Sequence, residues 1–191
     1  MIKAVIFDCF GVLVGQGFDA TYRQAGGNPD IDRAFIKDLL GATNMGIITP
    51  EQMNERVCVQ LGISAEAWTN AVLQTQQPDQ QLLDFAKALK PTYAIGILSN
   101  ANIGTLGRKF APEQLTIFDA IVVSADVGMI KPDPEIYRLV AERLGVMPNE
   151  CVFTDDNNDF CDAARAVGMQ AIHYRHFLQF SEELDTLLTH A

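Results

Sequence analysis

The residues of this sequence that could carry chemistry stand at four places, each directly after an apolar run or in a loop between two such runs. They are Asp8, Ser99 with Asn100, Lys131, and Asp155 with Asp156. Any one of them alone is equally typical of a turn or a helix cap. Together they supply a carboxylate that can act as a nucleophile, an ammonium group that can neutralise charge, and a pair of acids that can bind a cation.

The acids of this set predict a bound divalent cation. Asp8, Asp155, Asp156 and Asp159 would lie near one another, with Lys131 as the lysine that balances them. Like-charged carboxylates in one site raise one another's pKa or require a cation. Mg²⁺ prefers a few carboxylate oxygens together with waters and a substrate phosphate. We expect Asp156 to bind the metal, and Asp159 to cap the helix that follows.

These groups converge only if the apolar runs are parallel strands that end at the same edge of a sheet. The runs are short, rich in Val, Ile or Phe, and nearly continuous, as expected when helices cover both faces of a sheet. The predicted strands are Lys3–Phe7, Tyr93–Leu98, Ala120–Ser124, Cys151–Thr154 and Gln170–Tyr174.

Helical patterns alternate with these strands. We predict helices over Pro78–Leu89, Asp133–Leu144, Asp159–Val167 and Ser181–Leu188, with Ser181 as the N-cap of the last one. Alternation of this kind predicts an α/β fold, a doubly wound (Rossmann-like) parallel sheet of five strands.

One interval breaks the alternation. Residues 17–77 contain helical patterns near Asp30–Leu40, Pro50–Leu61 and Ala65–Gln76, and no convincing strand. We interpret them as a small all-helical cap inserted after the first strand, and residues 1–16 with 78–191 as the α/β core. Ligands of open α/β sheets bind outside the carboxyl ends of the strands, so this cap is placed to act as a lid.

The composition of the chain limits the classes of molecule that we expect it to bind. The 191 residues carry a formal net charge of −10, which repels nucleic acid and anionic lipid, so we expect a small-molecule substrate instead. The apolar run before Asp8 is too short for a signal-peptide core or a membrane span, and the four cysteines form no C-x-x-C pair. We therefore expect a cytoplasmic protein with reduced thiols. The oligomeric state is not readable from the sequence.

Four segments of the chain resemble the motifs of one enzyme family. They are Ile6–Leu13 (IFDCFGVL), Ile97–Asn100 (ILSN), Lys131–Pro134 (KPDP) and Val152–Asp156 (VFTDD). In this order they are similar to the four motifs of the haloacid dehalogenase-like superfamily of hydrolases, and residues 17–77 resemble its small helical cap.

The resemblance implies a role for each motif. It implies that Asp8 attacks the substrate to form an aspartyl intermediate and that Lys131 neutralises the developing charge. It implies that Ser99 and the backbone N–H of Asn100 hold the transferring group. The implied Mg²⁺ ligands are Asp8, the backbone carbonyl of Phe10, and Asp156, with Asp155 as a neighbour or alternate ligand.

The chain departs from the family pattern at Phe10, where most phosphatases of the family carry a second Asp that protonates the leaving group. Loss of a general acid–base typically costs about 10²–10⁴ in rate. The leading hypothesis remains a Mg²⁺-dependent phosphatase on a small phosphorylated metabolite. Metal-independent 2-haloacid dehalogenation is an alternative, because the family's dehalogenases carry an aromatic residue at this place. A non-catalytic descendant that binds a metabolite or a protein is another.

A second departure is Phe160, where the family usually carries Asp or Asn, and its loss is expected to loosen Lys131 or the metal. Substrate selection is expected to lie in the cap. There Tyr22, Arg23, Arg33 and Trp68 are candidates, although a surface or core role explains each of them equally well.

Overall fold

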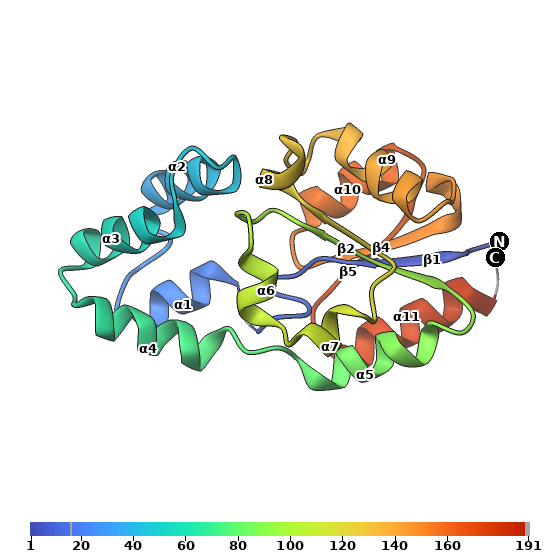
Figure 1. Ribbon diagram of the computed structural model, residues 1–191, viewed down its shortest axis with the longest axis horizontal. Helices are drawn as coiled ribbons and strands as arrows, with labels where there is room; N and C mark the ends of the chain where they lie inside the picture. The colour runs from blue at the N-terminus through green and yellow to red at the C-terminus, as the bar shows by residue number, and fades with distance from the viewer. Residues whose placement is uncertain (16, 190–191) are drawn as a thin grey trace.

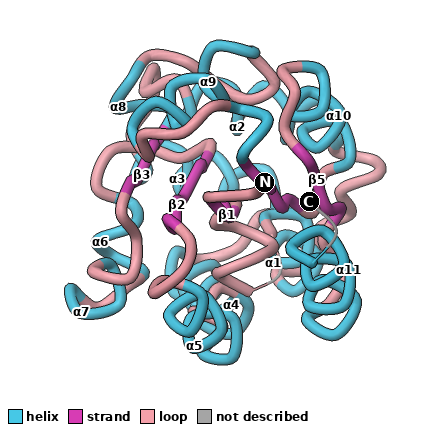
Figure 2. The backbone as a smooth tube through the Cα atoms, turned by 90° about the vertical axis from the view of Figure 1, so that its right-hand side faces the viewer, coloured by secondary structure: helices cyan, strands magenta, loops and turns pink. Residues whose placement is uncertain are grey.

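The computed structural model describes residues 1–15 and 17–189, and within them the predicted α/β sheet is confirmed. Five parallel strands lie in the order β3-β2-β1-β4-β5 (Figure 2). Their bounds are β1 Ala4–Phe7, β2 Ala94–Ser99, β3 Ala120–Val123, β4 Cys151–Asp155 and β5 Gln170–His173. From the central β1 the chain continues through β2 to β3 at one edge of the sheet. It then crosses over to β4, on the other side of β1, and ends the sheet with β5.

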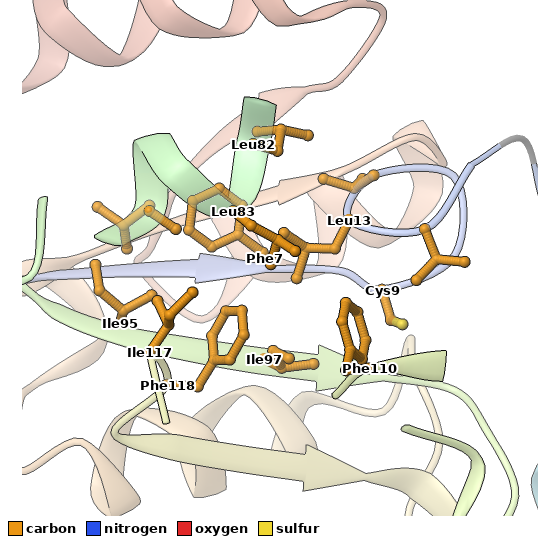
Figure 3. Close-up of a cluster of buried hydrophobic side chains, with 14 of the residues drawn as sticks. Phe7, Cys9, Leu13, Leu82, Leu83, Ile95, Ile97, Phe110, Ile117 and Phe118 are labelled. Atoms are coloured by element: carbon orange, nitrogen blue, oxygen red, sulfur yellow. The ribbon is translucent and has the colours of Figure 1, made fainter. Parts of the chain in front are cut away.

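Helices cover both faces of this sheet. In Figure 2, α5 (Gln80–Leu89) and α11 (Phe177–Thr189) lie on one side, while α9 (Pro134–Arg143) and α10 (Asn158–Ala166) lie on the other. Alternate residues of β1 therefore enter two different cores: Phe7 packs with Leu83 and Ile97 (Figure 3), and Ile6 packs with the α9 side. This burial on both faces explains why the strands read as continuous apolar runs.

The remaining short helices are α6 (Thr105–Lys109), α7 (Pro112–Leu115), α8 (Ser124–Val127) and the 3₁₀ turn η1 (Pro148–Glu150). They lie in the connections that flank β3 and β4. Within the described residues, no helix is both long enough and apolar enough to cross a bilayer.

Two predicted helix caps are wrong. Ser181 is not an N-cap, because α11 begins at Phe177 and the Ser181 hydroxyl donates to a carbonyl of the preceding turn. The earlier start carries Phe180 into the core, where it is fully buried. Asp159 does not cap α10 either: the N-cap is Asn157, whose side chain accepts the backbone N–H of Asp159.

Four helices stand beyond the carboxyl ends of the strands, at the opposite end of the molecule from both termini (Figure 1). They are α1 (Phe18–Gln24), α2 (Arg33–Asn44), α3 (Pro50–Leu61) and α4 (Ala65–Thr75), and we call them the cap helices. They share a small core of their own that includes Tyr22, Leu39 and Trp68. Helix α1 was not predicted, because it is short and has no side-chain cap.

The division into a core and a cap at residues 16 and 17 stays a prediction, and residue 16 lies outside the described residues. Where the chain enters and leaves the cap helices, its two segments run side by side. The backbone N–H of Gly15 donates to the carbonyl of Gln77, and Val14 forms a bridge with Pro78. The cap helices are thus joined to the core through one paired segment.

The cap helices also touch the core at a second place, far from that paired segment in the sequence. The Ser124 hydroxyl lies 2.8 Å from the carbonyl of Asn44, and the Asn102 amide donates to the carbonyl of Ile48 at 3.1 Å. The Ser124 oxygen also accepts the backbone N–H of Ala101 at 3.0 Å. The segment 44–48 is therefore held against the loop that follows β2.

Replacing Ser124 with Ala should loosen this contact without unfolding the sheet. A single hydrogen bond is worth about 0.5–1.5 kcal/mol net, so amide hydrogen exchange in residues 45–48 should accelerate about 2- to 12-fold. Exchange of the β1 and β2 amides should not change. Ser181→Ala, which removes an exposed hydroxyl of α11, is the control. Equal exchange rates in the two variants would contradict the contact.

Candidate active site

The carboxyl ends of the central strands bring the polar residues together at one edge of the sheet. Asp8 directly follows β1, while Ser99 and Asp155 are the last residues of β2 and β4. Lys131 lies in the loop between α8 and α9 and reaches back over β1. Its Nζ lies 2.6 Å from Oδ1 of Asp8 and 2.5 Å from Oδ2 of Asp155. All four side chains are buried.

Lys131, Asp8 and Asp155 form an ion triad, and the pKa values of Lys131 and Asp8 are both raised in it, for different reasons. Burial opposes the charged form of Lys131, but the charges of Asp8 and Asp155 outweigh it, so the pKa of Lys131 is raised. For Asp8, burial dominates over the attraction of Lys131, and the repulsion of Asp155 adds to it, which raises the pKa of Asp8 to about 7. One ammonium group is therefore not enough to hold all the acids of the site in their charged form.

The third acid, Asp156, increases this excess. Its pKa is raised to about 6, first by burial and then by the charge of Asp155. Oxygen atoms of Asp8, Asp155 and Asp156 lie within 4.8 Å of one another. Three carboxylates at this spacing offer the hard oxygen donors that Mg²⁺ prefers, so the residues present fit a divalent cation.

The two acids of the pair are not equivalent. Asp155 is fully engaged within the protein: one carboxylate oxygen pairs with Lys131 and the other accepts the backbone N–H of Asn157 at 2.9 Å. Asp156 is exposed as a whole residue, but its carboxylate is partly enclosed because it lies against Gly11 in the loop that follows the first strand. Asp155 is therefore the partner of Lys131, and the role of Asp156 as the metal ligand stays a prediction.

Gly11 allows this close approach. Its φ is +93°, and a Cβ at this position would lie 2.2 Å from Oδ2 of Asp156. A side chain would both strain the backbone and displace the carboxylate. The preceding Phe10 is half-buried, and its side chain packs against the core cluster around β1. The assignment of its carbonyl as a metal ligand stays a prediction.

Ser99 has a buried hydroxyl group that lacks a hydrogen-bond partner in the described part of the chain. Its side chain is completely buried, and its Oγ has no hydrogen-bond partner among the described residues. A buried hydroxyl without a partner costs about 1–3 kcal/mol. The role of Ser99 in holding the transferring group stays a prediction.

Asn100 has a structural role that the sequence analysis missed. Its side-chain amide makes two hydrogen bonds with the backbone of Lys131, accepting from its N–H at 2.8 Å and donating to its carbonyl at 3.0 Å. This pair fixes the loop that presents the lysine. The role predicted for the backbone N–H of Asn100 stays a prediction. The position of this amide directly after β2 was the available signal in the sequence. It does not identify the partner, which lies 31 residues away.

Two further supporting residues were also missed. The ring of His173, on β5, lies 2.9 Å from the carbonyl of Asp156, and Asn157 donates to Asp155 while it caps α10. His173 holds the backbone of Asp156, and Asn157 holds the carboxylate of Asp155. The spacing along the sequence does not indicate the contact of His173, because β5 reaches the site only through the order of the strands.

A cavity of about 730 Å³ opens between the cap helices and the core. Of the three acids, Asp156 lines it. The other lining residues are Gly11, Val12, Gly15, Gly17, Ala20, Gln74, Thr75, Gln77, Asp79, Tyr174 and Arg175. These include amides and a hydroxyl from α4 and the segment after it, none of which the sequence analysis singled out.

The four cap residues considered for substrate selection lie elsewhere. Tyr22 and Trp68 are buried in the core of the cap, where the Tyr22 hydroxyl donates to Asp32. Arg23 and Arg33 are exposed and pair with Asp30 on the surface. The core and surface interpretations therefore hold for these side chains.

Comparison with known proteins agrees with this arrangement. A family model described as haloacid dehalogenase-like hydrolase matches residues 2–168. The sesquiterpene phosphatase of Aspergillus oryzae is 29% identical over 201 residues, which cover 97% of this chain and 96% of that protein. Mouse acyl-CoA dehydrogenase family member 10 is 28% identical over 207 residues, which cover 97% of this chain but 19% of that protein. The chain thus spans only about a fifth of the mouse relative.

A solved structure shows the same fold. A HAD family enzyme from Bacteroides thetaiotaomicron, in complex with magnesium and inorganic phosphate, superposes with a TM-score of 0.69. It is 23% identical and covers 92% of this chain and 95% of its own.

The raised pKa of Asp8 predicts how the metal-free protein responds to pH. Below about pH 4 Asp8 is protonated in both the folded and the unfolded state, and between about 4 and 7 the folded state holds the proton more tightly. Stability should therefore fall as pH rises through this window. Asp8→Asn, which mimics the protonated acid and leaves the Lys131–Asp155 pair, should raise the melting temperature at pH 8 by several degrees.

The gain should nearly vanish at pH 4.5, and Mg²⁺ at pH 8 should reduce it, because the wild-type protein is then stabilised by the metal. In a domain of this size about 1 kcal/mol corresponds to roughly 2–4 °C. Thermal unfolding in a chelator provides the measurement. Asp185→Asn, at an exposed acid of α11, is the control, and a pH-independent gain for Asp8→Asn would contradict the assignment.

Proposed function

Because the chain belongs to the haloacid dehalogenase-like hydrolases, we propose that it is a Mg²⁺-dependent phosphatase acting on a small phosphorylated metabolite. The family match over residues 2–168 confirms the resemblance of the four motifs. One observation carries the proposal: Asp8 lies beside a buried lysine and within ligand distance of two further acids, at the same edge of the sheet as the buried, unpartnered hydroxyl of Ser99.

The reaction begins at Asp8. Its carboxylate attacks phosphorus, the bond between phosphorus and the ester oxygen breaks, and an aspartyl phosphate forms. Attack of water on that phosphorus then releases inorganic phosphate and restores the carboxylate. Lys131 holds Asp8 in position through the 2.6 Å contact and balances the charge that gathers on the transferring oxygens.

Bound Mg²⁺, held by Asp8 and Asp156, would neutralise the phosphate and make the phosphorus more electrophilic. Without a cation, an anionic substrate would meet a site in which carboxylates outnumber the single ammonium group. Ser99 would donate its hydroxyl hydrogen to a phosphoryl oxygen, which resolves the missing hydrogen bond of this buried side chain.

Phe10 decides which phosphates react well. Phenylalanine cannot protonate a leaving oxygen, and it occupies the position two residues after the nucleophile. Leaving groups that depart without a proton, as from aryl or acyl phosphates, should therefore be favoured over simple alkyl phosphates. For an alkyl phosphate, a water or a group of the substrate itself must supply the proton.

The acid pair argues against dehalogenation. A 2-haloacid carries its own carboxylate, which Asp155 and Asp156 would repel. A non-catalytic descendant is compatible with the same buried triad, so turnover is what separates it from the phosphatase.

The first test is phosphate release from an aryl phosphate. The wild-type protein should release phosphate with Mg²⁺ present and lose this activity in excess chelator, with recovery on adding Mg²⁺. Asp8→Asn should lower the rate by at least about 10⁴-fold, since it removes the nucleophile. Asp185→Asn should match the wild type.

Silence of the wild type across a broad panel of phosphoesters would refute the phosphatase. Chloride release from a 2-haloacid that continues in chelator would establish the dehalogenase instead. Binding of a metabolite without turnover of either substrate class would establish the non-catalytic alternative.

The second test restores the missing acid. Phe10→Asp should raise kcat for an alkyl phosphate by about 10²-fold or more, and raise it much less for an aryl phosphate, because only the alkoxide needs a proton. Phe10→Asn, of the same size but without a proton to transfer, is the matched control. If both variants change the two substrates equally, proton supply is not what limits the wild type.

A further inference from the structure

The ammonium group of Lys131 has a second set of neighbours besides its two carboxylates. Its Nζ lies 4.9 Å from the centroid of the Phe160 ring and 5.3 Å from that of Phe153. Both distances fall within the range of a cation–π interaction, which gains strength where water is excluded. The ammonium group is almost completely buried, so this condition is met.

The hydrogen bonds of Lys131 show why aromatic rings are suitable neighbours for its ammonium group. An ammonium group has three N–H donors, and within the described residues two of them are taken by Asp8 and Asp155. The third donor has no oxygen acceptor there, and the faces of Phe153 and Phe160 are within reach. The rings attract the cation without adding a further negative charge to a site that already holds three acids.

Both rings are themselves held in place. Phe153 lies on β4, fully buried, and meets the Tyr137 ring edge to face at 5.4 Å. The Tyr137 hydroxyl donates to the backbone carbonyl of Phe160 at 3.0 Å, next to the point where α10 begins. One tyrosine of α9 therefore supports both rings under the lysine.

We propose that Phe160 is a positioning residue that, with Phe153, holds the Lys131 ammonium group between Asp8 and Asp155. The sequence analysis expected Phe160 to loosen this lysine, because it replaces a polar residue. The contact leads to the opposite conclusion: the ring supports the lysine from the side that has no carboxylate. The consequence for turnover rests on the proposed phosphatase function, whereas the position of the lysine does not.

The test compares variants at residue 160 that separate shape from aromatic character. Phe160→Leu keeps an apolar side chain and removes the ring, and Phe160→Tyr keeps the ring. Phe177→Leu is the matched control, since Phe177 is also a half-buried ring that packs in an aromatic pair, but on the far face of the sheet.

The first readout needs no activity. In the wild type, the rings should shift the NMR signals of the Lys131 side chain away from those of ordinary lysines. Phe160→Leu should return them part of the way, because the Phe153 ring remains, Phe160→Tyr should retain them, and Phe177→Leu should leave them unchanged. Signals that do not move in folded Phe160→Leu would overturn the proposal.

The second readout is kinetic. With an aryl phosphate and Mg²⁺, kcat of Phe160→Leu should fall about 3- to 30-fold while KM stays within about 2-fold, and Phe160→Tyr should recover most of kcat. A general loss of packing would be matched by Phe177→Leu and would not be rescued by tyrosine. If the wild type hydrolyses no phosphate, the proposed function fails and the NMR readout still decides the position of the lysine.

Discussion

The structure depends on one buried cation. Removing an ammonium group from water costs several kcal/mol, and this cost is met only when well-placed partners replace the water. Lys131 obtains those partners from two different strands, Asp8 after β1 and Asp155 at the end of β4. These strands are neighbours in the sheet, so the ion triad forms only when the central strand pairing is correct. Fold and site therefore share the same interaction.

The triad also explains why the acids need more than the lysine. The ammonium group satisfies one oxygen of Asp8 and one of Asp155, and Asp156 adds a third carboxylate on the exposed side. The protein alone accommodates this excess by holding protons, as the raised pKa values of Asp8 and Asp156 indicate. A divalent cation would replace those protons, so metal affinity and pH are linked at this site.

The sequence predicted the features that depend on local pattern. Continuous apolar runs marked the central strands, because both faces of β1 and β4 are buried, whereas the edge strand β5 is only partly buried. The strand ends marked Asp8, Ser99 and the acid pair. It did not predict features that depend on tertiary packing. Helix α11 starts early because Phe180 enters the core, and the amide of Asn100 acts on a loop that is distant in the sequence.

Phe160 illustrates the same limit in the site. Judged against the family pattern, a phenylalanine there is the loss of a polar group. Its effect on Lys131 depends on the neighbouring ring of Phe153 and on the tyrosine beneath both, and none of these distances can be read from spacing. A phenylalanine at residue 160 looks disruptive in the sequence, but in the folded structure it is compatible with an ordered Lys131.

Ser124 has one hydroxyl hydrogen and two carbonyl oxygens within reach, that of Asn44 in the cap helices at 2.8 Å and that of Ala101 in the core at 3.0 Å. When segment 44–48 moves away, the hydrogen can turn to Ala101, so no donor is stranded in an apolar environment. Separation of the two parts would therefore leave the Ser124 hydroxyl bonded within the core and would lose only the contact with Asn44, worth about 0.5–1.5 kcal/mol. The core therefore keeps its own acceptor for the one hydrogen bond through which Ser124 reaches the cap helices, and no buried donor is left unpaired on the core side when that bond is absent.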